Sequence, residues 1–226
     1  MKKPVANYKE FRFSKLKDKE FSHLLLLLAW PVYFAFYIIT ENFISYDSCH
    51  VVHHQLDELF PFCEYFVVPY VLWFALVAGS LIYYLLYNTE HFKQLMTFII
   101  VTQVVAMAIY IIYPNRQDLR PEFFERNNVF TKIVGFLYSI DTSTNVCPSL
   151  HVAYSIGIAS VWLKDHDASV IWKIFIVLLT VSICLSTLFI KQHSVVDTFV
   201  AIPVCILAEI IAFGKTYWFP KFRKKT

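Results

Sequence analysis

Long apolar runs separated by short polar connections dominate this chain. A helix needs about 20 mainly apolar residues to cross a bilayer core of about 30 Å, because each residue advances the helix by about 1.5 Å. The runs that meet this length are Phe21–Thr40, Tyr65–Tyr87, Leu95–Tyr113, Val170–Ile190 and Val195–Phe213. A sixth run, Leu150–Leu163, is shorter and reaches adequate length only if its helix begins near Pro148. The pattern predicts six membrane-spanning helices.

The composition supports a membrane protein. Hydrophobic residues make up 58% of the 226 residues and charged residues only 16%, so a soluble domain would lack the polar surface that covers a core. The segment Val129–Ile140 is apolar on one side and carries Lys132, which favours a short interfacial helix between the third and fourth spans. We therefore expect an all-α integral membrane bundle. Residues 21–213 form its single domain, and residues 1–20 and 214–226 are basic cytoplasmic tails.

The distribution of lysine and arginine predicts the orientation. Both ends of the chain are rich in these residues, whereas residues 41–64 contain none of them. Cytoplasmic loops carry an excess of Lys and Arg, so both termini of a multi-pass plasma-membrane protein are expected in the cytoplasm. No basic stripe on a nucleic-acid-binding fold is present, so the bilayer and a lipid are the expected partners, with no obligatory protein partner.

Five basic residues are exceptions to this distribution of charge. They fall in the connections predicted to be external: Arg116, Arg120, Arg126, Lys132 and Lys191. Cations placed against the topological preference need a local reason. An anionic ligand on the extracytoplasmic side is the simplest one.

Three segments carry residues suited to chemistry, and all three are expected on that external side. They are YPNRQDLRP (Tyr113–Pro121), NVCPSLH (Asn145–His151) and STLFIKQHSVVD (Ser186–Asp197). In the third segment, His193 and Asp197 are four residues apart and share a helical face. A carboxylate there can accept the imidazole Nδ1–H and leave Nε2 free as a nucleophile.

The other two segments supply complementary groups. His151 offers a second imidazole that can protonate a leaving oxygen or activate water. Ser149 suits the first turn of a helix, whose free N–H groups bind phosphate oxygens. Arg116, Arg120 and Lys191 add positive charge. Together these groups indicate phosphoryl transfer through a phosphohistidine, with no metal and no cofactor.

These segments resemble the three signature motifs of the type 2 phosphatidic acid phosphatase superfamily, over roughly the second half of the chain. The resemblance implies that His193 is the nucleophile, Asp197 its orienting partner and His151 the general acid, with phosphate bound by Arg120 and Ser149. Tyr113 stands where the family commonly has a lysine, and Arg116 is a candidate to take over its role. Lys191 is a candidate replacement for a cation usually found beside Ser186.

Three functions are consistent with these residues. The first is hydrolysis of a lipid phosphate monoester or diphosphate, of the phosphatidic acid, phosphatidylglycerol phosphate or polyprenyl phosphate type. The second is transfer of the phosphoryl or head group to a lipid alcohol, since the PSLH sequence is similar to the inositol phosphorylceramide and sphingomyelin synthase branch. The third is a non-catalytic membrane protein in which these residues are structural.

Residues 49–58 hold a weaker pattern. His50 and His54 would share one face of a helix, as would His53 and Asp57, which is compatible with a metal site as well as with a solvated loop. Cys49 and Cys63 lie in or beside this same loop. The sequence leaves open whether they pair or remain free thiols.

Overall fold

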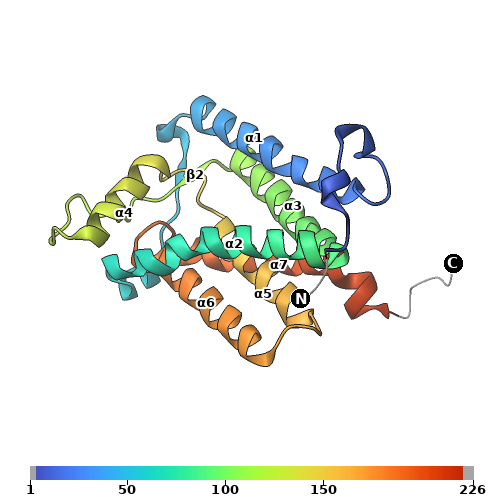
Figure 1. Cartoon of the computed structure of the whole chain (residues 1–226). Coiled ribbons are helices and arrows are strands. Elements are labelled where there is room, and N and C mark those ends of the chain that lie inside the picture. Colours follow the sequence, from blue (N-terminus) through green and yellow to red (C-terminus); the bar gives the residue numbers. More distant parts are fainter. Residues whose placement is uncertain (1–3, 221–226) are drawn as a thin grey trace.

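The computed structural model describes residues 4–220, and it is a helical bundle (Figure 1). Helix accounts for 72% of the structure and strand for 2%, which confirms the all-α class. The predicted basic residues Lys2, Lys3, Lys221, Arg223, Lys224 and Lys225 lie outside the described residues.

Seven α-helices occur within residues 4–220. They are α1 (Ala29–Phe43), α2 (Val67–Tyr87), α3 (Thr89–Ile112), α4 (Val129–Ile140), α5 (Leu150–Lys164), α6 (Val170–Phe189) and α7 (Val195–Phe213). Two short strands, β1 (His50–Val51) and β2 (Asn115–Arg116), pair in parallel. Short 3₁₀ segments occupy Tyr8–Glu10, Phe13–Lys15, Ser22–Leu28, Tyr46–Ser48, Gln55–Leu59 and Glu64–Phe66, and a π-helical turn occupies Gly214–Trp218.

Five helical segments are long and apolar enough to cross a membrane. They are Ser22–Phe43, Glu64–Tyr87, Thr89–Ile112, Val170–Phe189 and Val195–Trp218. They correspond to the five full-length runs in the sequence. The third begins six residues before the predicted Leu95, because the Asn88 side chain caps it by accepting the His91 amide at 3.1 Å. The last continues helically to Trp218, beyond the predicted boundary of the C-terminal tail at residue 214.

The expected fourth span is the short helix α5. Its 15 residues begin only after the Ser149 cap, so it does not gain the extra turn from Pro148. It packs against α2, α3, α6 and α7, and most of its residues are buried. At 15 residues α5 lies in the centre of the bundle but is not among the helical segments long enough to cross a membrane.

The first and last described segments of the chain lie at the same end of the bundle. The Tyr8 hydroxyl donates to the Leu85 carbonyl at the end of α2, and Gln94 near the start of α3 donates to Thr216 after α7. Figure 1 shows the first turns of the chain and the end of α7 on the same side. The opposite end of the bundle therefore holds the ends of α3 and α6 and the starts of α5 and α7.

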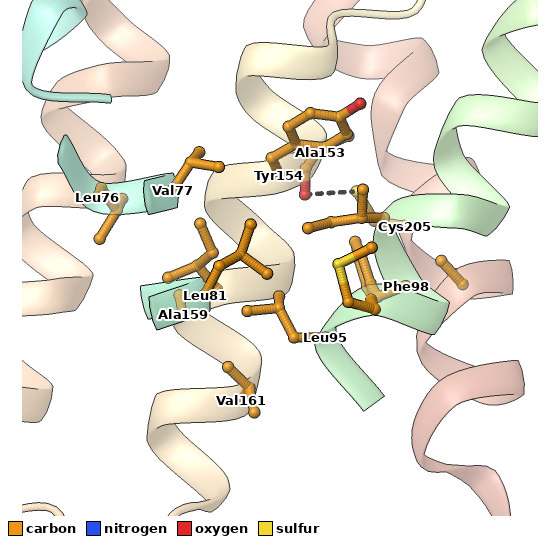
Figure 2. Packing of buried hydrophobic residues seen from close by; sticks show 14 of the residues in the cluster. Leu76, Val77, Leu81, Leu95, Phe98, Ala153, Tyr154, Ala159, Val161 and Cys205 are labelled. Carbon is orange, nitrogen blue, oxygen red and sulfur yellow. Dashed lines mark hydrogen bonds between the residues drawn. The ribbon is translucent and has the colours of Figure 1, made fainter. Parts of the chain in front are cut away.

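The main hydrophobic core surrounds α5 (Figure 2). Ala153 and Tyr154 of this helix lie near Cys205 of α7, whose thiol contacts the Ala153 carbonyl at 3.9 Å. Phe98 of α3, which is fully buried, packs directly over Gly157, so that a β-carbon at this glycine would overlap the phenyl ring. The glycine thus sets the approach of α3 to α5.

Gly157→Ala is expected to destabilise the fold by about 1–3 kcal/mol, because the added methyl group must displace a closely packed ring. Gly79→Ala in α2 is the matched control, since a β-carbon there meets no atom within 4 Å. Alanine at that position should be neutral or stabilising by up to about 1 kcal/mol through helix propensity. Thermal unfolding of both variants in the same detergent measures the difference. Equal stability of the two variants would contradict the packing described here.

Candidate functional site

The first two predicted segments are joined by a buried asparagine side chain. Asn115, in β2, accepts hydrogen bonds from the backbone amides of Val146 and Cys147 at 2.9 and 2.8 Å. It donates to the carbonyls of Tyr113 and Cys147, both at 3.0 Å. A buried amide with its donors and acceptors paired holds a specific arrangement, because each unpaired group would cost about 1–3 kcal/mol. These bonds fix the loop that precedes α5.

The third segment is tied to the other two through backbone groups. The Ser149 amide donates to the Asp197 carbonyl at 3.2 Å, which places the starts of α5 and α7 side by side. The Gln117 side chain donates to the Lys191 carbonyl at 3.0 Å. The structure therefore brings the three segments together at one end of the bundle, although they are far apart in the sequence.

His193 and Asp197 form a hydrogen-bonded pair at the start of α7. The Nδ1 atom of His193 lies 3.1 Å from Oδ2 of Asp197, and the carboxylate is fully buried. The same oxygen accepts the Ser194 amide at 2.9 Å, which completes a capping box at this helix start. A carboxylate at this position favours the imidazole tautomer with the proton on Nδ1, which leaves Nε2 as the acceptor.

His151, one residue into α5, faces this acceptor. Its Nδ1 lies 3.4 Å from Nε2 of His193. Its ring packs between Tyr70 and Trp73 of α2, with ring centroids 4.6 and 4.3 Å away. Two imidazoles from separate helices thus lie in contact, and the second is held between aromatic rings.

A cavity of about 540 Å³ reaches both imidazoles. Its walls are mainly apolar and aromatic, and they come largely from α1 and α2. The α1 and α2 residues that line it are Trp30, Tyr33, Phe34, Tyr37, Tyr70, Trp73, Phe74, Val77, Ala78 and Leu81. Its polar lining residues include His151, His193, Gln192 and Asp141, together with Thr142, Thr144 and Asn145. The cavity is therefore a mainly apolar pocket that both histidines line.

The four predicted phosphate-binding residues do not line this cavity. Arg120 lies next to it and donates to the carbonyls of Asp141 and Thr142 and to the side-chain oxygen of Gln192. Its guanidinium stacks on the Tyr138 ring at 4.4 Å. Burial lowers the pKa of Arg120, and Asp141 opposes that change. Arg120 thus supports the loop that carries Asp141 and the residue before His193.

The other three occupy similar supporting positions. The Lys191 ammonium donates to the Asp57 carbonyl at 2.9 Å, and burial lowers the pKa of this lysine. Arg116 pairs with Asp118 and with the Tyr46 hydroxyl. Ser149 is buried and caps α5 through the Val152 amide. Each of the four predicted phosphate-binding residues therefore has a protein partner in the structure.

Sequence reasoning missed several polar groups beside the histidines. The Asp141 carboxylate accepts hydrogen bonds from the Tyr70 hydroxyl at 2.9 Å and from Gln192 at 3.2 Å. Desolvation raises the pKa of Asp141 above its ordinary value. Of these residues only Gln192 could have been noticed in the sequence, because it directly precedes His193. Asp141 follows α4 and lies outside the three segments.

The histidine-rich loop has structural roles. The His54 ring accepts the Leu56 amide, and the Asp57 carboxylate accepts backbone amides. No group of three or more His, Cys, Asp or Glu side chains within residues 4–220 has the arrangement of a metal site. Cys49 and Cys63, whose pairing the sequence left open, are both free thiols.

Comparison of the chain with protein-family models, with curated proteins and with solved structures finds no match. The resemblance to the type 2 phosphatidic acid phosphatases therefore remains a prediction, and it depends on the three short segments.

Proposed function

We propose that this chain is a membrane lipid phosphatase of the type 2 phosphatidic acid phosphatase kind. In this proposal α5 completes a bundle of six spans, α4 lies at the membrane interface and both termini are cytoplasmic. The histidine pair then faces the extracytoplasmic side of the plasma membrane. The substrate is a lipid phosphate monoester or diphosphate, and the reaction uses neither a metal nor another cofactor.

The observation that carries the proposal is the alignment of Asp197, His193 and His151 at the end of an apolar cavity. The carboxylate orients one imidazole, whose free Nε2 points to the second imidazole. A nucleophile, its orienting partner and a proton donor are the groups that phosphoryl transfer through a covalent intermediate requires. An apolar cavity that ends at these groups suits a substrate that joins a hydrocarbon chain to a phosphate.

The reaction has two steps. In the first, the Nε2 lone pair of His193 attacks phosphorus, the bond from phosphorus to the lipid oxygen breaks, and His151 gives its proton to that oxygen. In the second, neutral His151 takes a proton from water, whose oxygen attacks phosphorus and breaks the bond to Nε2. Inorganic phosphate and the dephosphorylated lipid are released, and both histidines return to their starting states.

The two rings must separate when substrate binds. The 3.4 Å contact between Nδ1 of His151 and Nε2 of His193 leaves no space for phosphorus between them. In-line attack places the leaving oxygen on the far side of phosphorus from Nε2. His151 therefore has to move away from His193 to meet that oxygen.

Arg116, Arg120 and Lys191 can stabilise the charge of the phosphoryl group once they exchange their present protein partners for phosphate oxygens. The buried Nε atoms of Arg116 and Arg120 have no hydrogen-bond partner among the described residues, so each retains a donor. Lys191 lies two residues before the nucleophile, and Ser149 marks the N-terminal end of α5, where free amides favour anions. Stabilisation of charge in the transition state is usually the largest catalytic contribution.

A lipid panel tests the proposal directly. Purified protein is given phosphatidic acid, phosphatidylglycerol phosphate and polyprenyl diphosphate, each labelled in the phosphate, with and without diacylglycerol or ceramide as acceptor. Hydrolysis predicts labelled inorganic phosphate whether or not an acceptor is present. A new labelled lipid would instead identify a transferase, and release of no label from any donor would contradict an enzymatic function.

Narrowing the cavity should reduce activity on lipids more than on small substrates. Ala78 of α2 lines the cavity, and Ala78→Phe is expected to lower kcat/KM for a long-chain lipid phosphate about 10-fold. Activity on a water-soluble short-chain phosphate should change by less than about twofold, because that substrate needs only the histidine end.

The matched control is Ala75→Phe, an exposed position one turn earlier in α2 that does not line this cavity. It should leave both activities unchanged. An equal loss for long and short substrates in Ala78→Phe would show that the hydrocarbon chain does not occupy the cavity.

A further inference from the structure

One acidic side chain from the loop between α1 and α2 lies buried against the start of α7. Asp57 is 3% exposed. Its Oδ1 accepts the Val195 amide at 2.7 Å, and its Oδ2 accepts the Ser194 hydroxyl at 2.8 Å. The same Oδ2 accepts the His54 amide at 2.8 Å, so the carboxylate is also fixed within its own loop. Three donors therefore hold this carboxylate in one orientation.

These contacts act on the two residues that directly follow His193. Ser194 is held on two sides, because its amide donates to Asp197 and its hydroxyl donates to Asp57. Amides in the first turn of a helix have no partner within the helix, and negative charge is favourable there. The Asp197 and Asp57 carboxylates thus bind different groups at the start of α7. Asp197 orients the imidazole, and Asp57 fixes the backbone that carries it.

Asp57 also contacts the chain before His193. Its carbonyl oxygen accepts the Lys191 ammonium at 2.9 Å. Lys191 has φ +55°, a left-handed conformation that costs a non-glycine residue free energy and persists only where its surroundings fix it. The loop that contains Asp57 therefore holds the chain on both sides of the histidine.

From this geometry we propose that Asp57 is a positioning residue that holds the segment 191–195 so that Nε2 of His193 points toward His151 and the cavity. The role deepens the proposed function and depends on it, because it is exerted on the proposed nucleophile. A displacement of about 1 Å at a reacting group can cost on the order of 100-fold in rate.

The test uses Asp57→Asn, which keeps the side-chain shape but turns one acceptor into a donor that faces the Ser194 hydroxyl or a backbone amide. Single-turnover phosphorylation of His193 by a labelled lipid phosphate gives a rate constant and an amplitude. We expect the rate constant to fall roughly 100-fold. The amplitude and the lipid concentration that gives half the maximal rate should change by less than about threefold. A merely structural role would lower the amplitude, through loss of folded protein, and leave the rate constant unchanged.

Two further variants isolate the contact. Glu58→Gln removes the same charge from the exposed neighbouring residue and should behave as wild type. Ser194→Ala removes one of the donors that Asp57 binds, so Asp57→Asn should cost several-fold less in that background than in wild type. Fully additive losses would contradict an action of Asp57 through Ser194.

Amide hydrogen exchange of Ser194 and Val195 separates this inference from the proposed function, since it needs no substrate. Exchange at these amides should be at least about 10-fold faster in Asp57→Asn, because both depend on the arrangement that the carboxylate holds. Unchanged exchange overturns the positioning role whatever the activity. Faster exchange in a chain that acts on no lipid phosphate would instead support the contact and overturn the phosphatase.

Discussion

Replacing His193 with alanine is expected to lower phosphate release from a lipid phosphate by roughly 10⁴-fold or more. The variant lacks the atom proposed to bond to phosphorus, and removal of a covalent nucleophile commonly costs this much or more in kcat. KM should change little, because the cavity walls that hold the hydrocarbon chain remain. Phosphate release by purified wild-type and variant protein under saturating lipid measures the effect.

Asp197→Asn is the matched comparison, since it leaves the imidazole in place but removes the charge that orients it. We expect an intermediate loss of roughly 10²–10⁴-fold. Retention of wild-type activity in His193→Ala would exclude this histidine as the nucleophile. A loss in Asp197→Asn larger than that in His193→Ala would show that the carboxylate acts in some way other than through the ring.

Replacing His151 with alanine should lower hydrolysis of a lipid phosphate by roughly 10²–10⁴-fold, the usual range for loss of a general acid or base. The size of the loss should depend on the leaving group. A lipid alkoxide needs a proton as it departs, whereas p-nitrophenolate is stable without one. Phosphorylation of the enzyme by p-nitrophenyl phosphate should therefore be reduced far less than phosphorylation by the lipid.

Single-turnover rates for the two substrates make this comparison independent of the later water step, in which the proposed mechanism also uses His151. Tyr70→Phe is a useful control, because it keeps the ring that packs on His151 and removes only the hydroxyl that donates to Asp141. It should retain the leaving-group behaviour of wild type. Equal losses for both substrates in His151→Ala would contradict the role of proton donor to the leaving oxygen.

Much of the architecture could be predicted from the sequence, because apolar length and local capping determine it. The range Val129–Ile140 coincides with α4, where the Asn128 and Thr131 side chains form a capping box, and its place at the membrane interface stays a prediction. The sequence also predicted that His151 and His193 could meet, because the segments that carry them were expected on the same side. The short apolar run Leu150–Leu163 matches α5 to within one residue at its end, but its burial among four other helices could not be read from its composition.

The partners of the cations could not be read from the sequence. Arg120 binds the carbonyls of Asp141 and Thr142, and backbone acceptors carry no residue signature. The contact of Asp57 with Ser194 joins residues 137 positions apart, so no local pattern indicates it. Motif spacing identifies groups that suit a reaction, but the path of the connecting loops decides which of them support the site and which face the cavity.

Mapping the phosphorylated residue is the most direct test of a His193 nucleophile. The protein is mixed with a phosphate-labelled lipid, quenched in alkali after a fraction of one turnover, digested and analysed by mass spectrometry. We expect an acid-labile, alkali-stable phosphoryl group on His193 in wild type and in His151→Ala, and none in His193→Ala. A labelled residue other than His193, or turnover with no labelled protein at any time, would contradict it.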